Sequence, residues 1–300
     1  MTKSNNTKKS FLVLGGYGFI GRHVIDHLRR MGHKVVVSSR KPSGNEDAIK
    51  VVAHKDSIGE LEAKVKGFDA VINTIGILRE RLGESYEAVH HHFVDRVARV
   101  CSDRGTRFVH VSALGLNNPV RSRFLTSKAD SELALRRSGA DWVIVRPSII
   151  DGDGGYGAKW FRRVARWPVH FAPVNSKGQL QPIHVKDLAE AIAVLALAPQ
   201  IGRERREIEL GGEDVVAIFE YLELLKGSAI RWQLKVPAWL ARVCSHVCDL
   251  LYLTPFSFGH YELLKFDNLP VKNHLPRLLG RAPRLIGLKT KETVFGGIHA

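Results

Sequence analysis

The sequence predicts an α/β fold, a doubly wound parallel sheet followed by a small, mostly helical C-terminal lobe. Strand-type and helix-type patterns alternate through the first 150 residues, as they do in folds with helices on both faces of a sheet. The strand segments are apolar at consecutive positions, which is typical of strands buried on both sides. After residue 150 the alternation is lost, and residues 215–300 have a mostly helical pattern with several prolines.

Each predicted strand is a short apolar run that ends at turn residues, and glycines close most of the helices between them. In the first helix Ile20, Val24 and Leu28 share one face, and Gly32 ends it. The predicted strands are Phe11–Leu14, Lys34–Ser38, Ile49–Ala53, Phe68–Asn73, Phe108–Ser112, Trp142–Arg146 and Glu207–Leu210, and the predicted helices are Phe19–Met31, Glu84–Asp103, Thr126–Arg137 and Val185–Leu197.

The chain is expected to divide into three parts. Residues 1–9 form a polar, basic tail that we expect to be disordered, and they lack the apolar core of a signal peptide. Residues 10–212 form the α/β domain, with 151–184 contributing to a substrate lobe, and residues 213–300 form the small C-terminal lobe. No apolar run reaches the roughly 18 residues that a membrane span needs. Three cysteines make no disulfide framework, so the cytoplasm is the expected compartment.

The net charge of +15 predicts an anionic partner, and the excess is spread over both halves of the chain. Phosphorylated cofactors, anionic lipid surfaces, acidic proteins and nucleic acid all fit this charge. No helix-turn-helix, zinc-finger or RNA-binding motif is present, so nucleic acid is not expected.

Residues 15–21 read GGYGFIG, a glycine-rich turn between a predicted strand and a predicted helix. Gly18 and Gly21 satisfy the dinucleotide-binding spacing with either Gly15 or Gly16 as the first glycine. Such a turn lets a pyrophosphate approach backbone N–H groups at the helix N-terminus, where larger side chains would block it. The strand–glycine–helix context favours an NAD(P)-binding Rossmann domain over a merely structural turn.

The end of the second predicted strand favours NADP(H) over NAD(H). An NAD-selective site places an acid there to bind the ribose 2′-hydroxyl, whereas this chain has Ser39, Arg40 and Lys41, which suit a 2′-phosphate. Arg22, at the start of the first helix, adds positive charge. The alternative is an ordinary solvated basic loop. Asp56 is a candidate contact to the adenine amino group or, equally, a helix N-cap.

Several segments resemble the short-chain dehydrogenase/reductase superfamily in its atypical extended branch. Within that branch the chain is most similar to the nucleotide-binding accessory subunit family of respiratory complex I and its bacterial relatives. The segments that carry the resemblance are GGYGFIGRHVIDHLRRMGHKVVV at 15–37, FVHVSALG at 108–115, SKADSELALRRSGADWVIVRPSIIDGDGG at 127–155, QPIHVKDLAEAIAVL at 181–195 and TPFSFGHYELLKFDN at 254–268.

The resemblance implies a Rossmann domain that binds NADPH. Relatives include active reductases and proteins in which the cofactor is chiefly structural. Taken together, the glycine turn, the basic strand end and the resemblance predict a set of cofactor-binding residues: Gly15, Tyr17, Gly18, Phe19, Ile20, Arg22, Ser39, Arg40, Lys41, Asp56, Ile75, Gly76, Lys128, Pro147 and Ser148.

The predicted catalytic positions lack the usual proton donor. Active members of the superfamily pair a Tyr-x-x-x-Lys motif with a serine, and the resemblance places Ser112 and Lys128 at two of these positions. Phe124 stands where the tyrosine would be. Losing a general acid costs on the order of 10²–10⁴ in rate, while Lys128 can still hold a ribose. Lys128 itself or Tyr156 could supply the proton instead.

Three functions follow from this pattern, and whether the chain turns over a substrate stays open. The first is an NADP(H)-binding protein beside the respiratory chain or quinone metabolism, with a respiratory-complex or other protein partner. The second is an NADPH-dependent reductase of a hydrophobic carbonyl or quinone-like substrate. The third is a regulator that senses NADP(H) without turnover. Peripheral contact with an anionic membrane, at its inner face, fits the charge.

Two further patterns have alternative interpretations. His90, His91 and His92 are consecutive, so on a helix they point about 100° apart and cannot converge on one ion; no metal site is predicted. Two stretches mix aromatic, aliphatic and basic residues, which suits a membrane interface or a hydrophobic partner but also a lobe packed on the Rossmann domain. These stretches are Trp160–Arg163 with Arg166 and Trp167, and Trp239, Leu240, Val243 and Val247 beside Arg242.

Overall fold

A computed structural model describes residues 8–41, 47–119, 121–198, 206–251 and 262–287. The chain forms two compact units. Unit 1 comprises residues 1–111, 130–145 and 189–207, and unit 2 comprises residues 112–129, 146–188 and 208–300. Most of the predicted N-terminal tail lies outside the described residues, and the predicted domain boundary at residue 212 stays a prediction.

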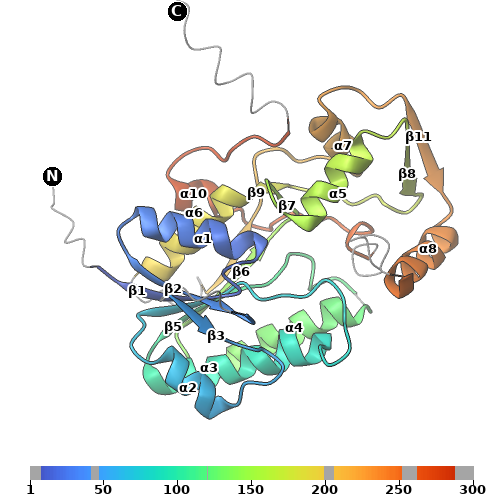
Figure 1. Cartoon of the computed structure of the whole chain (residues 1–300). Helices are drawn as coiled ribbons and strands as arrows, with labels where there is room; N and C mark the ends of the chain where they lie inside the picture. Colours follow the sequence, from blue (N-terminus) through green and yellow to red (C-terminus); the bar gives the residue numbers. More distant parts are fainter. Residues whose placement is uncertain (1–7, 42–46, 120, 199–205, 252–261, 288–300) are drawn as a thin grey trace, which may run out of the picture. The chain divides into compact units, whose positions relative to one another are not determined.

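A seven-stranded sheet confirms the predicted Rossmann-type fold (Figure 1). Its order is β10-β6-β5-β4-β1-β2-β3, and every neighbouring pair from β3 to β6 runs parallel. All seven predicted strands occur, with β3 beginning one residue earlier and ending three residues earlier than expected. The strands are β1 (Ser10–Leu14), β2 (Lys34–Ser39), β3 (Ala48–Lys50), β4 (Ala70–Asn73), β5 (Arg107–Val111), β6 (Trp142–Pro147) and β10 (Glu207–Leu210).

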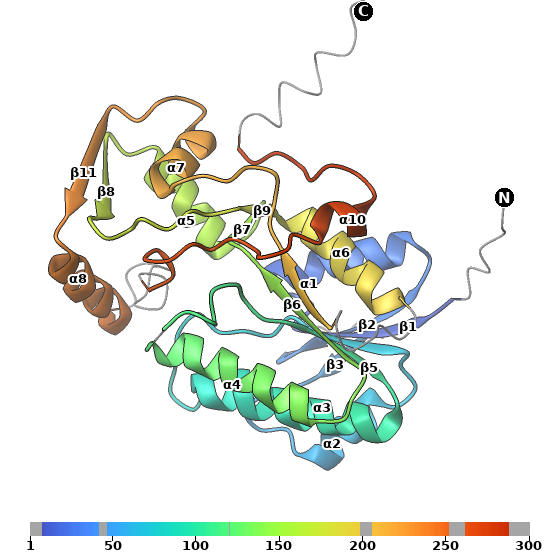
Figure 2. The same cartoon turned by 180° about the vertical axis from the view of Figure 1, so that it is seen from behind.

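Helices cover both faces of this sheet. Helix α1 (Phe19–Arg30) lies on one face, and α2 (Ile58–Val65) and α3 (Phe93–Arg104) lie on the other, as the two opposite views show (Figures 1 and 2). Leu12, Val71 and Phe93 are fully buried in the core beneath α2 and α3. Burying one such side chain stabilises the fold by about 1.5–3 kcal/mol, so the consecutive apolar strands account for the layered arrangement.

A π-helical turn, η1 (Glu87–His92), begins the helix predicted over 84–103. The wider turn directs His90 inward, where its Nε2 accepts a hydrogen bond from the Ile77 N–H at 3.0 Å. His91 and His92 stack on each other at 4.9 Å beside Glu87. Of the three consecutive histidines, His90 is buried, His91 is partly exposed and His92 is exposed, so the helix is half-packed at this point.

Unit 2 contains the mostly helical C-terminal region and two unpredicted strand pairs. The strand β11 pairs with β8 in parallel, and β7 pairs with β9. Helix α4 (Arg123–Arg137) and helix α6 (Val185–Leu197) contribute residues to both units. The other elements are β7 (Ile150–Asp151), α5 (Tyr156–Ala165), β8 (Val169–Pro173), β9 (Ile183–His184), α7 (Ile218–Lys226), β11 (Trp232–Val236), α8 (Ala238–Leu251) and α10 (Leu275–Leu279). Within the described residues, no helix is both long and apolar enough to cross a bilayer.

The buried carboxylate of Asp187 ties α6 to the C-terminal part of unit 2. Asp187 lies inside the first turn of α6 and is fully buried. Its oxygens accept hydrogen bonds from the Arg281 guanidinium at 2.8 Å, from the Arg284 N–H at 2.6 Å and from the Arg284 guanidinium. Two cations and one backbone donor thus offset the cost of burying this charge.

We expect Asp187→Asn to lower the free energy of unfolding by about 2 kcal/mol. Hydrogen bonds to a charged acceptor are each worth about 1.5–3 kcal/mol, and the neutral asparagine side chain can accept only some of the bonds that the carboxylate accepts. Chemical denaturation measures the change. Asp95→Asn is the control, since its partner Arg99 is exposed and Asp95 is itself partly exposed, and pairs at the surface contribute about 0.5 kcal/mol. Equal effects of the two substitutions would contradict a structural role for Asp187.

Candidate cofactor site and catalytic residues

The glycine turn holds α1 close to the end of β1. Gly15 has φ +77°, a left-handed conformation that favours glycine, and its oxygen accepts the Gly18 N–H at 2.8 Å. A Cβ on Gly21 would lie 2.5 Å from the Gly15 oxygen, and a Cβ on Gly16 would lie 2.5 Å from the Val37 side chain. Gly16 and Gly21 are therefore needed for the packing of the helix against the sheet.

The N-terminus of α1 has the properties of a phosphate-binding site. Gly18 is its N-cap, no side chain caps it, and its first turn contains no acid. A Cβ on Gly18 would meet only the Gly15 oxygen, at 3.0 Å, so this side of the turn leaves room for a ligand. Backbone N–H groups and the positive end of the helix dipole favour an anion at such a place. The residues present therefore fit a dinucleotide pyrophosphate.

The loop after β4 lies beside this turn in unit 1. The strand order reverses between β1 and β4, and the carboxyl ends of strands at such a reversal form the usual nucleotide crevice. The Thr74 hydroxyl donates to the Leu14 oxygen at 2.8 Å, and a Cβ on Gly15 would lie about 3 Å from Ile75. Gly76 and Ile77 follow, held by the buried His90. The structure thus brings Gly15 and Ile75, both predicted cofactor residues, together.

Arg40 is engaged by an acid that the sequence did not reveal. Its Nη1 donates to both carboxylate oxygens of Glu84, at 2.9 and 3.1 Å, and the Nδ1 of His54 lies 3.6 Å from the same carboxylate. The Ser39 hydroxyl bonds to the backbone of Lys41. A 2′-phosphate at this strand end would compete with Glu84 for Arg40. The partners are 44 residues apart, so no local pattern could have indicated the pair.

Asp56 is not the N-cap of α2. Ser57 holds that position, and its side chain forms a capping box with Glu60. One oxygen of Asp56 accepts the Lys64 ammonium at 2.5 Å and the Val52 N–H at 3.2 Å. The N-cap interpretation was therefore wrong, and the adenine contact stays a prediction.

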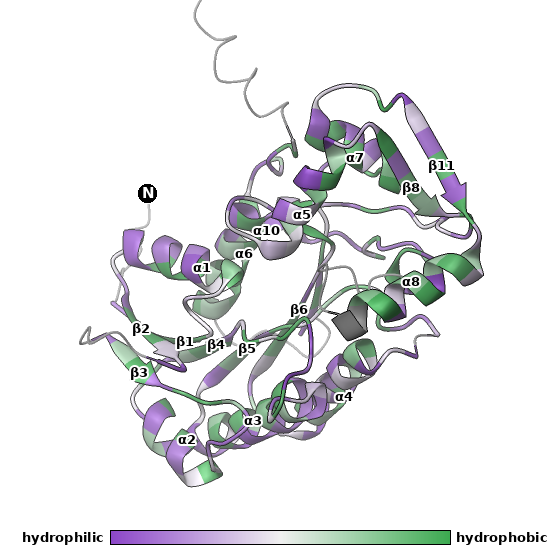
Figure 3. Ribbon diagram, turned by 45° about the vertical axis from the view of Figure 1, so that its right-hand side comes forward, coloured by the Kyte–Doolittle hydropathy of each residue, from purple (hydrophilic) through white to green (hydrophobic). Residues whose placement is uncertain are grey.

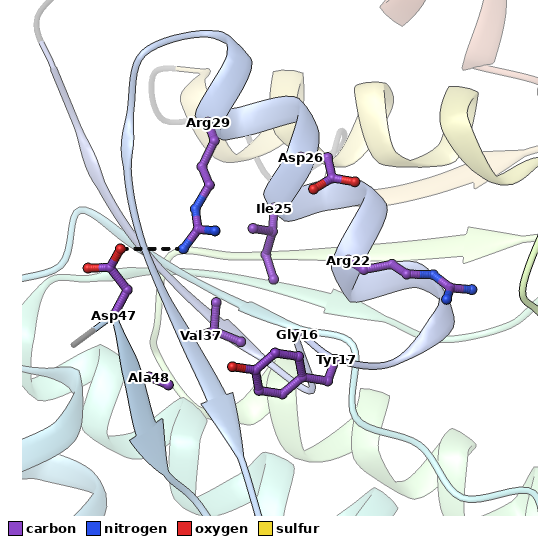
Figure 4. A pocket seen from close by; sticks show the side chains of 9 residues that line it. All are labelled: Gly16, Tyr17, Arg22, Ile25, Asp26, Arg29, Val37, Asp47 and Ala48. Carbon is purple, nitrogen blue, oxygen red and sulfur yellow. Dashed lines mark ion pairs between the residues drawn. The ribbon is translucent and has the colours of Figure 1, made fainter. Parts of the chain in front are cut away.

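A cavity of about 450 Å³ lies beside α1 and β2 in unit 1 (Figure 4). Tyr17 and Arg22, two predicted cofactor residues, line it, and an ion pair of 3.5 Å between Arg29 and Asp47 closes one side. The Arg22 guanidinium lies 5.7 Å from the centre of the Phe19 ring. The complete lining is Gly16, Tyr17, Arg22, Ile25, Asp26, Arg29, Val37, Asp47 and Ala48.

The predicted catalytic residues Ser112, Phe124 and Lys128 all belong to unit 2. Ser112 follows β5 and is buried. Because α4 begins at Arg123, Phe124 and Lys128 lie one turn apart, and the Lys128 Nζ is 5.8 Å from the centre of the Phe124 ring. Their spacing of four residues predicts that the two share one helix face, and the structure confirms this. Phe124 is itself largely buried and has no polar atom on its ring.

Two polar residues near the C-terminus hold the predicted site segments and were missed from the sequence. The carboxylate of Glu262 accepts the N–H groups of Arg121 and Ser122 at 3.0 and 2.7 Å, just before α4 begins. Asn268 accepts the Ser148 hydroxyl at its side-chain oxygen, 2.8 Å away. Ser148, a predicted cofactor residue next to Pro147, therefore has a structural partner in the C-terminal segment.

A buried carboxylate follows the same turn. Asp151 is almost completely buried and binds the Arg162 guanidinium at 2.7 Å. Burial raises the pKa of the Asp151 carboxyl, and Arg162 partly offsets this. Burial also raises the pKa of the Tyr221 phenol well above its usual range, and the charge of Asp151 raises it further. Tyr156, the candidate alternative proton donor, begins α5 with 60% of its surface exposed.

Potential metal ligands also occur outside these segments. Glu87, His91 and His92 place three ligand atoms within 4.8 Å of one another, although Glu87 and His92 are exposed. Acidic groups at a surface are common without an ion. The expectation of no metal site stays a prediction.

A family described as NAD(P)H-binding matches residues 15–167, more than half of the chain. The chain belongs to this NAD(P)H-binding family. The match begins at Gly15 and extends past the turn at Pro147 and Ser148. It thus spans both the glycine turn of unit 1 and the Phe124 and Lys128 positions of unit 2.

The chain is similar in sequence to a subunit of mitochondrial NADH dehydrogenase and to a bacterial reductase. The NAD(P)H-binding chain is 28% identical over 278 residues to NADH dehydrogenase (ubiquinone) 1 alpha subcomplex subunit 9, mitochondrial, of Arabidopsis thaliana, covering 86% of this chain and 68% of that protein. It is 28% identical over 227 residues to ceramide reductase of Caulobacter vibrioides, and the match covers 72% of this chain and 68% of the reductase. These relatives confirm the resemblance seen in the sequence.

Solved structures confirm the fold. The UDP-glucose 4-epimerase of Thermus thermophilus, in complex with NAD, matches with a TM-score of 0.60 and 17% identity, covering 97% of this chain and 100% of the epimerase chain. At this identity the likeness shows the fold alone. The chain therefore shares the Rossmann-type fold of this NAD-bound epimerase.

We expect Asp151→Asn to change how stability depends on pH. Because the folded pKa of Asp151 is raised, the unfolded chain ionises first as the pH rises past the ordinary value of 3.8, and the free energy of unfolding then falls. The asparagine variant lacks this loss, so its stability relative to the parent protein should increase from acid to neutral pH. Denaturation curves of both proteins across that pH range measure the free energy of unfolding. If the difference between variant and parent did not change with pH, the prediction would be contradicted.

Proposed function

We propose that the chain is an NADP(H)-binding protein of the short-chain dehydrogenase/reductase type in which the proton-donating tyrosine is replaced by Phe124. The observation that carries this is the pair on α4: Lys128 keeps the position of the ribose-binding lysine, and the neighbouring ring has no hydroxyl. Cofactor binding is thereby retained while the usual acid is absent. The cofactor then chiefly stabilises the protein or reports redox state to a partner.

Specific residues would hold the cofactor. The N-terminus of α1 would take the pyrophosphate, Ile75 and Gly76 would border it, and Lys128 would bind the nicotinamide ribose. NADPH, when bound, supplies a hydride. The preference for NADP(H) over NAD(H) is supported by the lack of an acid at the end of β2 and by Arg40. Glu84 opposes it, because Arg40 must leave this carboxylate to bind a phosphate.

We also propose a working place beside respiratory or quinone machinery, at the inner face of a membrane, with a respiratory-complex or other protein as partner. The similarity to a complex I subunit supports this. The net charge of +15 supports contact with an anionic surface.

The second candidate function is an NADPH-dependent reductase of a hydrophobic carbonyl or quinone-like substrate. The similarity to ceramide reductase favours it. Lys128 or Tyr156 would then donate the proton, since Phe124 has none to give. Incubating the protein and NADPH with quinones separates the two functions: the binding protein leaves NADPH reduced, whereas the reductase oxidises it.

We expect substitutions at Arg40 and Glu84 to change cofactor preference in opposite directions. Arg40→Asp should weaken NADPH binding by about tenfold or more, since a charge-assisted hydrogen bond is worth about 1.5–3 kcal/mol, with a much smaller effect on NADH. Glu84→Gln should strengthen NADPH binding several-fold, because Arg40 no longer has to leave a charged carboxylate to bind the phosphate. Fluorescence titration with each cofactor gives the dissociation constants. Equal effects on both cofactors would contradict the 2′-phosphate assignment.

We expect Phe124→Tyr to raise NADPH-dependent reduction of quinones or hydrophobic carbonyls, by up to about 10²-fold, because the phenol restores a general acid beside Lys128. Loss of NADPH absorbance reports the rate. The matched control is Phe124→Leu, which changes the ring without adding a hydroxyl. If the tyrosine and leucine variants had the same rate, the site would not be a reductase site that lacks only its acid.

A further inference from the structure

The strand pair β8–β11 presents an unusual apolar face to solvent. Its parallel register places Leu234 opposite Phe171 and Trp232 opposite Val169, so these side chains share one face. The alternate residues of β8, His170 and Ala172, are buried in unit 2. The outer face of such a ribbon is normally polar, yet here Phe171, Trp232 and Leu234 are each about half exposed or more.

Helix α8 adds further exposed apolar side chains next to this strand pair. It begins two residues after the end of β11, and it contacts β8. Trp239, Val243 and Val247 follow each other at four-residue intervals and are exposed, while the small residues Ala241 and Ser245 are buried. The helix therefore turns its larger apolar side chains outward, and its ribbon is predominantly hydrophobic in colour (Figure 3).

We define the docking face as Phe171, Trp232, Leu234, Trp239, Val243 and Val247, which are between 42% and 67% exposed. Large apolar side chains that gather at a protein surface in this way mark an interaction site. Tryptophan in particular favours the boundary between lipid and water, because its ring is apolar and its N–H is polar.

The charge around the docking face selects an anionic occupant. The segments 156–174 and 230–248, which contain α5, β8, β11 and most of α8, carry seven Lys and Arg residues and no Asp or Glu. One of the seven, Arg162, is paired with Asp151 outside these segments, so its charge is already offset. Arg231, Lys235 and Arg242 are exposed beside the apolar side chains. Long basic side chains can cover apolar surface with their stems and hold the charge at lipid headgroups.

We propose that unit 2 docks on an anionic bilayer through this face, with the two tryptophans at the level of the headgroups and the basic residues on anionic lipids. An acidic protein would match the charge but would not need three adjacent elements with outward aromatic and aliphatic side chains. This docking face would form the membrane contact that is part of the proposed function, and the inference rests on that contact. It does not depend on cofactor binding.

Vesicle flotation of the full chain tests the proposal. We expect binding to vesicles of phosphatidylcholine mixed with phosphatidylglycerol, weak binding to phosphatidylcholine alone, and release at high salt. Lys235→Glu with Arg242→Glu should lower partitioning at least about tenfold, because each basic residue contributes roughly fivefold at an anionic surface. Trp232→Ser with Trp239→Ser should lower it as well and should abolish quenching of tryptophan fluorescence by brominated lipids.

Matched substitutions outside the face are the controls. Lys66→Glu with Lys272→Glu changes the same net charge, and Leu133→Ser with Val271→Ser removes two other exposed apolar side chains. We expect both pairs to float nearly as well as the parent protein. No flotation on anionic vesicles at low salt, or equal loss in the control pairs, would overturn the proposal. NADPH affinity, measured on every variant, should stay unchanged, so failure of docking is distinguishable from failure of the cofactor site.

Discussion

The close approach of α1 to the end of β1 is the constraint on which the nucleotide site depends. Gly21 has no room for a side chain because the Gly15 oxygen would lie 2.5 Å from its Cβ. The helix is thereby fixed with its uncapped N-terminus at the edge where the strand order reverses. The loop after β4 reaches the same edge, because Thr74 bonds back to Leu14. Backbone geometry alone thus gives this edge the properties that a dinucleotide pyrophosphate needs.

A different constraint acts in unit 2. The position of Phe124 and Lys128 follows from where α4 begins, and two backbone N–H groups just before that point bind the buried carboxylate of Glu262. Hydrogen bonds of this kind, from backbone donors to a charged acceptor, are stronger than neutral ones. The C-terminal segment therefore holds the start of the helix that carries the predicted catalytic positions, although Glu262 is 138 residues from Phe124 in sequence.

Local patterns in the sequence predict the sheet, the glycine turn and the shared face of Phe124 and Lys128, because each depends on residues close together in the chain. The pairs Arg40–Glu84, Ser148–Asn268 and Asp187–Arg281 join distant residues, and no periodicity indicates them. The strand β11 was missed for another reason. Its residues lie in a region of helical pattern with prolines, and all but the last are exposed, so they lack the burial signal of a strand.

These distant pairs also decide where the net charge of the chain acts. Composition spreads the basic excess over both halves, but the fold offsets part of it: Arg40 meets Glu84, and Arg281 and Arg284 meet Asp187. Around the docking face no acid lies within the two basic segments. Charges separated by more than a Debye length of about 8–10 Å are largely screened. An approaching surface is therefore attracted by the local charge and not by the net charge of the whole chain. On the proposed docking face, the attraction to an anionic surface therefore comes from the exposed cations Arg231, Lys235 and Arg242 beside the tryptophans of unit 2.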